Sequence, residues 1–177
     1  MAITISGDSP SFASYQGGVL VSGTAQASTS GTSIDFTSIP SWVKRITVMF
    51  NGVSTSGTSA PIIQLGDSGG VETTSYVSTA LGIQTSTAVA ANSTAGFLVV
   101  TPTMYAASST INGSVSITTL STNLWVVAGA TSREAGSATG YSTAGSKSLS
   151  DTLDRIRITT VGGTDTFDAG SINILYE

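Results

Sequence analysis

The stretch SIPSWVKRITVMFNGVS, residues 38–54, decides the fold of this chain. From about Val43 onward its apolar residues alternate with the others, so that Ile46, Val48 and Phe50 share one side. A period of two residues is typical of a β-strand that buries one face and leaves the other in contact with solvent. The stretch therefore predicts a strand of a sheet whose inner face belongs to a hydrophobic core.

Trp42 comes just before this strand and is followed closely by the cations Lys44 and Arg45. In the preferred interpretation Trp42 closes the end of the core, while the two cations point to solvent or pair with acids. In the alternative, Trp42 is a stacking platform for a sugar ring with the cations around it. Trp42 is therefore also a candidate ligand contact.

The same alternation recurs farther along the chain, in residues 114–119, 155–158 and 171–176. Asn-Gly and Gly-Gly pairs, which tolerate positive φ in turns, separate such runs, and no segment shows a convincing helical pattern. These features predict an all-β fold, an antiparallel jelly-roll-like β-sandwich. The predicted core consists of Ile46, Val48, Phe50, Val115, Ile117, Ile156, Ile158, Ile172 and Ile174.

A chain of 177 residues is long enough for one sizeable core and does not require a second. We expect residues 1–31 to form a short N-terminal arm and linker and residues 32–177 to form the sandwich. The segment 22–33, SGTAQASTSGTS, has few apolar residues and is expected to be a linker or mobile loop. In the arm, AITI and GVLV alternate enough to add strands to a neighbouring sheet.

A second polar segment, TSREAGSATGYSTAGSKS at residues 131–148, is long enough to be a displayed loop. Loops of this kind carry function more often than the strands that they join. Arg133 and Tyr141 within it are accordingly candidate ligand contacts, together with Trp42.

Composition excludes several kinds of chemistry. The chain has no Cys and no His, so it cannot build a Ser-His-Asp or Cys-His catalytic site or a thiolate metal site. A net charge of −4 with only six basic residues disfavours nucleic acid as a partner. No apolar run approaches the ~20 residues that cross a bilayer, and no secretory signal is visible at the N-terminus.

The paired acids Asp151/Asp154 and Asp165/Asp168 are the remaining candidates for catalysis or calcium binding. Neither pair has the spacing of a known calcium loop, and we interpret both as turn residues or as partners of Arg155 and Arg157. The sequence therefore predicts a protein that is not an enzyme and has no cofactor and no metal site.

Residues 33–57, SIDFTSIPSWVKRITVMFNGVSTSG, and residues 148–177, SLSDTLDRIRITTVGGTDTFDAGSINILYE, resemble a β-rich domain of tailed-bacteriophage structural proteins. That domain is most often found at the C-terminal tip of tail-fibre-like proteins. The resemblance implies a non-enzymatic virion component, displayed on the particle, and it supplies no catalytic or ligand residues.

From this resemblance we expect a tail-fibre-tip-like protein that adheres to host surface glycans, assembled in the host cytoplasm as part of the virion. The alternative is a capsid decoration (cement) protein that docks on the head lattice and stabilises it. Expected partners are capsid or tail subunits, other copies of the chain in a trimer, and a host glycan, with neither nucleic acid nor membrane.

Overall fold

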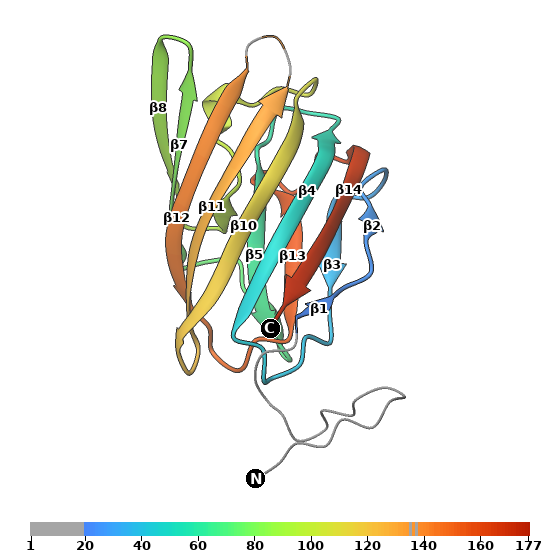
Figure 1. Cartoon of the computed structure of the whole chain (residues 1–177), viewed down its shortest axis with the longest axis vertical. Coiled ribbons are helices and arrows are strands. Elements are labelled where there is room, and N and C mark those ends of the chain that lie inside the picture. Colours follow the sequence, from blue (N-terminus) through green and yellow to red (C-terminus); the bar gives the residue numbers. More distant parts are fainter. Residues whose placement is uncertain (1–19, 135, 137) are drawn as a thin grey trace, which may run out of the picture.

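The computed structural model describes residues 20–134, 136 and 138–177, which form two antiparallel sheets packed face to face (Figure 1). The larger sheet contains, in spatial order, β1 (Val21–Ser22), β14 (Phe167–Tyr176), β4 (Arg45–Thr55), β10 (Thr110–Ser121), β11 (Leu124–Glu134), β12 (Thr139–Ser148), β7 (Val77–Gln84) and β8 (Thr87–Ser93), and β2 (Gln26–Ala27) also pairs with β14. The smaller sheet contains β3 (Ser33–Phe36), β13 (Arg155–Thr160), β5 (Pro61–Asp67) and β6 (Gly70–Val71), with β9 (Phe97–Leu98) on β5. The prediction of an all-β antiparallel sandwich is confirmed.

Helical structure is limited, in the part of the chain described, to one short 3-10 turn, η1 (Pro102–Met104). Ser, Thr, Val, Ile and Gly dominate the sequence, and all of them are neutral or poor helix formers. Accordingly, none of the described helical residues forms a helix long and apolar enough to cross a bilayer.

The core lies between the two sheets and contains every residue that the sequence assigned to it. Ile46, Val48 and Phe50 of β4 are buried, and their neighbours Thr47 and Met49 lie on the outer side of the larger sheet. The other predicted core residues, Val115, Ile117, Ile156, Ile158, Ile172 and Ile174, are also buried. The alternation read from the sequence therefore specifies the inner face of each of these strands correctly.

The segment 22–33, expected to be a linker or mobile loop, is instead partly joined to the sandwich. Ser22 pairs with Leu175 and Ala27 pairs with Ser171, both on β14. Ser28 is fully buried, and its backbone N–H donates to the carbonyl of Gly170 over 3.0 Å. The pairing comes from backbone groups, which composition does not reveal. Residues 1–19 of the predicted arm lie outside the described residues.

The segment 131–148, expected to be a displayed loop, is also corrected. It holds the end of β11 and the whole of β12, a ten-residue strand that pairs with β11 on one side and β7 on the other. Its Ser, Thr, Ala and Gly residues suggested a loop because they are small and polar. They fit here because only every second residue of β12 faces the core.

Candidate interaction surface

Trp42 is half-buried at the end of the core, as the preferred interpretation expected. Its ring packs against that of Tyr176, with centroids 5.9 Å apart, and it covers the edge of the main hydrophobic cluster. Lys44 and Arg45 are exposed, and Arg45 forms an ion pair with Glu177. The position of Trp42 is thus explained by packing, and its remaining exposed edge is what a ligand could contact.

Arg133, near the end of β11, and Tyr141, near the start of β12, share a hydrogen-bond acceptor. The strand register places them at the opposite end of the larger sheet from Arg45, near which Trp42 lies. The hydroxyl of Tyr141 donates to the carbonyl of Met104 over 3.1 Å, and the guanidinium of Arg133 donates to the same oxygen. Only 3% of Tyr141 is exposed, and burial raises the pKa of its phenol. The three predicted contact residues do not form one site, and Tyr141 faces the core.

The paired acids each have a structural partner. Asp154 accepts hydrogen bonds from Arg155, the nearer at 2.6 Å. Asp165 accepts the backbone N–H of Ser59 over 2.8 Å, and Asp168 accepts the hydroxyl of Ser54. These contacts fix turns and strand ends, and nowhere in the described ranges do three or more potential metal-ligating side chains cluster.

We therefore expect neither excess calcium nor EDTA to shift the thermal unfolding midpoint of the purified protein. A calcium site filled at 100 times its Kd would add about 2.7 kcal/mol to the free energy of unfolding, which a melting curve detects easily. A midpoint that rises with calcium and falls again with EDTA would contradict this reading of Asp165 and Asp168.

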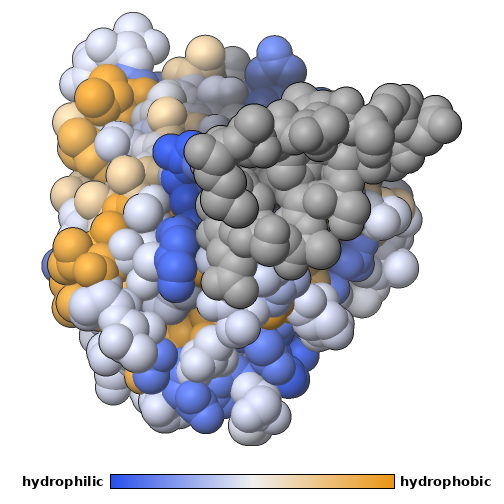
Figure 2. All heavy atoms as spheres, turned by 60° about the horizontal axis from the view of Figure 1, so that its bottom comes forward, coloured by the Kyte–Doolittle hydropathy of each residue, from blue (hydrophilic) through white to orange (hydrophobic). Residues whose placement is uncertain are grey.

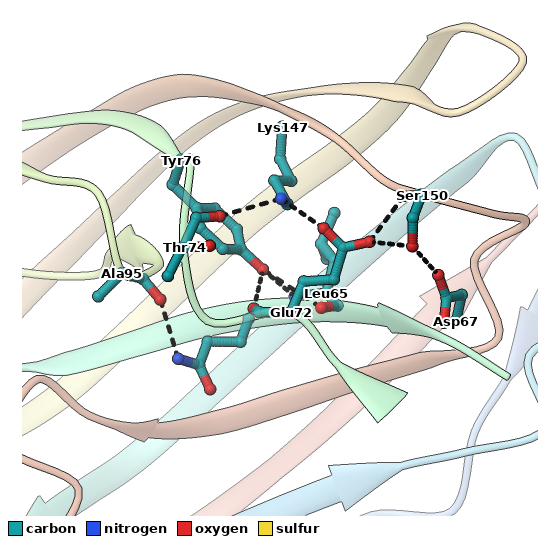
Figure 3. Close-up of polar contacts among 9 residues, drawn as sticks. Leu65, Asp67, Glu72, Thr74, Tyr76, Ala95, Lys147 and Ser150 are labelled. Carbon is teal, nitrogen blue, oxygen red and sulfur yellow. Dashed lines mark hydrogen bonds and ion pairs between the residues drawn. The ribbon is translucent and has the colours of Figure 1, made fainter. Parts of the chain in front are cut away.

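A buried lysine lies between the two sheets, and sequence analysis did not single it out as a structural residue (Figure 3). Lys147 of β12 has a side chain only 3% exposed, and its ammonium lies 2.5 Å from a carboxylate oxygen of Glu72. It also donates to the carbonyl of Thr74 over 2.9 Å and lies 5.1 Å from the ring centroid of Tyr76. The charge of this lysine is thus directed at groups of its own chain.

The same carboxylate connects to a second hydrogen-bonded group. Ser150 donates its backbone N–H to Glu72 over 2.6 Å and its hydroxyl to Asp67 over 2.6 Å. Burial alone would raise the pKa of Glu72, but the hydrogen bonds from Lys147 and Ser150 outweigh it and lower the pKa. The cluster joins β12 of the larger sheet to the β5–β6 region of the smaller one, so we interpret it as a clamp between sheets.

A shallow depression of about 240 Å³ lies where β2, β3 and β14 meet. Gln26, Asp35 and Tyr176 contribute to its lining. The Asp35 carboxylate already accepts two hydrogen bonds of 2.7 Å from Arg157. The most distinctive charged group of this depression is therefore neutralised by a neighbour, and it does not favour a charged ligand.

The outer face of the larger sheet is a further candidate surface. On β7, β12, β11 and β10 the inward residues alternate with outward ones that align in four rows across the strands. We call these sixteen residues the outer array. Strand by strand, with the rows in the same order, they are Val77, Thr79, Leu81 and Ile83 on β7; Ser146, Ala144, Ser142 and Gly140 on β12; Val126, Ala128, Ala130 and Ser132 on β11; and Thr118, Ser116, Ser114 and Asn112 on β10. None of these residues is ionisable, and most are small.

An apolar ridge runs along one side of the outer array. Val77, Leu81 and Ile83 of β7 are 66%, 38% and 58% exposed, and Ala88 and Ala90 of the adjoining strand β8 are also exposed. Figure 2 shows hydrophobic surface concentrated on the left, the side on which Figure 1 places β7, β8, β11 and β12. Single exposed apolar residues are ordinary, but several on neighbouring strands indicate an interaction surface.

No protein-family model, no curated protein and no solved structure matches this chain.

Proposed function

We propose that this chain is a non-enzymatic structural protein of a tailed-bacteriophage particle, displayed on the particle surface and acting by binding. The observation that carries the proposal is that the two segments that resemble phage proteins fold into strands that pair with each other. Residues 33–57 hold β3 and β4, and residues 148–177 hold β13 and β14. Although they are far apart in the chain, β3 pairs with β13 and β4 pairs with β14.

The two segments that resemble phage structural proteins therefore make one continuous part of the sandwich. Phe36 lies opposite Ile156 in one sheet, and Phe50 lies opposite Ile172 in the other. A resemblance that reflected only composition would not be expected to fall on strands that pair with each other. This supports a shared structural module made of β3, β4, β13 and β14.

Of the two virion roles, docking on other virion subunits has the stronger structural support. A decoration protein works by contact with protein subunits, and the uncharged outer array is suited to protein contact, with a copy of this chain or with another subunit, because it carries no ion that would lose its hydration. We therefore propose docking on capsid or tail subunits as the first role. Adhesion to a host glycan is the second candidate, favoured by the partial exposure of Trp42 and by the exposed cation Lys44 two residues farther on.

Immunogold electron microscopy of phage particles tests the proposal, with antibody raised against the recombinant 177-residue chain. We expect gold on intact particles, and a particle that lacks the gene product is the control. Gold spread over the head would favour decoration, and gold confined to the tail or fibres would favour adhesion and call for a glycan-binding screen. Particles without gold would overturn the virion assignment.

A further inference from the structure

We propose that the outer array packs against the outer array of a second copy of this chain, related to the first by a two-fold axis. Three observations carry this inference: the size of the face, its shape and the absence of ionisable residues from the outer array. It concerns the protein by itself: with the outer array buried between two copies, the pair docks on virion subunits through its other surfaces, and the test below does not depend on whether the chain belongs to a virion.

The surface has the size that a stable dimer needs. Counting β8 and β4 on its flanks, the face spans six neighbouring strands and four rows of side chains, and Arg45 of β4, in the row of Thr118, is a charged residue at its border. With strands about 4.8 Å apart and rows about 6.7 Å apart, it covers roughly 770 Å². A standard protein interface buries about 800 Å² on each partner.

The shape of the surface is self-complementary about an axis that runs between β11 and β12, parallel to the strands. Such an axis places the ridge on β7 over β10 of the partner. There the facing side chains are Ser114 and Ser116, which are small enough to accept Leu81 and its neighbours. The Ala residues of β11 and β12 allow the sheets between them to approach closely.

Charge leaves the outer array as the part of the surface where a second copy can approach. Each chain carries a net charge of −4, so two copies repel each other over most of their surfaces. The outer array itself has no ionisable residue, and the charges at its borders include Arg45, which is paired with Glu177, and the exposed Glu134 at the end of β11. An isologous interface also places every residue against its own equivalent surface, which an ionisable array would make unfavourable.

The test is the molar mass of the purified chain in solution, measured by light scattering over a range of concentrations. We expect the wild type to have twice the 17.7 kDa mass of one chain, and Val77→Lys and Ala130→Lys to raise the dimer Kd at least about tenfold. The matched control is Val161→Lys, which places the same charge at a position 47% exposed on the turn after β13. Circular dichroism confirms that each variant is folded.

A crosslink tests the axis itself, since the chain has no cysteine of its own. Leu81 and Ser114 lie in one row with β12 and β11 between them, which separates their Cα atoms by about 14 Å within one chain. A disulfide needs Cα atoms within about 7 Å, so a Leu81→Cys/Ser114→Cys variant can bridge only between copies.

We expect oxidation of this double variant to give a covalent dimer that reducing agent separates. A monomeric wild type, a dimer that both lysine variants leave intact, or the absence of the crosslink would each overturn the proposal. So would an odd number of copies, including the trimer that the sequence led us to expect, because a two-fold pair requires an even number.

Discussion

Replacing Lys147 by methionine is expected to lower the free energy of unfolding by about 2–3 kcal/mol. Methionine keeps the length and apolar stem of the side chain, so the loss is mainly that of the ammonium. Its removal leaves the Glu72 carboxylate and the Thr74 carbonyl without their buried donor. Breaking a fully buried ion pair costs about 3–5 kcal/mol. We expect a smaller loss of about 2–3 kcal/mol here, because the side chain of Glu72 is 22% exposed. In thermal unfolding the midpoint should fall by about 5–10 °C.

The control for this prediction is a double-mutant cycle with Glu72→Gln. Glutamine keeps an oxygen that can accept from Ser150, so the second substitution removes the charge and leaves that contact possible. We expect the double variant to be more stable than the sum of the two single losses predicts, by about 0.5–3 kcal/mol. A coupling energy of zero would show that the two charges do not stabilise each other and that the clamp is only a packing contact.

The same pair has a pH signature. The pKa of Glu72 is lowered in the folded protein from its ordinary value of 4.5, so its ionised form stabilises the fold above that pH. This contribution is lost as the pH falls through the lowered folded-state pKa. The stability gap between wild type and Lys147→Met should therefore be full at neutral pH and should narrow in acid, as followed by denaturant unfolding at a series of pH values.

Gly145→Ala is expected to destabilise the protein by about 2–3 kcal/mol, through backbone contact rather than through charge. Gly145 lies on β12 opposite Ser78 of β7. A Cβ atom at this glycine would lie 2.1 Å from the carbonyl oxygen of Val77 and 3.1 Å from the Cα of Ser78. Backbone atoms cannot turn aside as a flexible side chain can, so the two strands must separate locally. Hydrogen exchange should then show lower protection over residues 77–84.

Gly140→Ala, on the same strand, is the matched control. A Cβ atom there meets nothing within 4 Å, so the substitution should change the free energy of unfolding by no more than about 0.5 kcal/mol. Equal effects of the two substitutions would mean that residues 139–148 do not pair with β7 as described.

The sequence predicted the fold wherever large apolar residues alternate. Phe50 and Ile46 on β4, and Ile172 and Ile174 on β14, have only one arrangement that buries them together, and the alternation reveals it. β12 was missed because its inward residues include Thr143, Gly145 and Lys147, which carry no hydrophobic signal in sequence. Lys147 itself resembles a surface residue until Glu72 and Thr74 are brought beside it.

What the sequence determined by itself is local: which residues favour strands, which tolerate turns, and which chemistry the absence of Cys and His excludes. The tertiary structure alone decided which polar segments become strands, because a strand of small residues is held by the backbone hydrogen bonds and packing of its neighbours. It also decided the outer array, since sixteen residues from four separate strands become one uncharged surface only through their register. Pairing between distant strands is a property of the whole chain, and no local pattern encodes it.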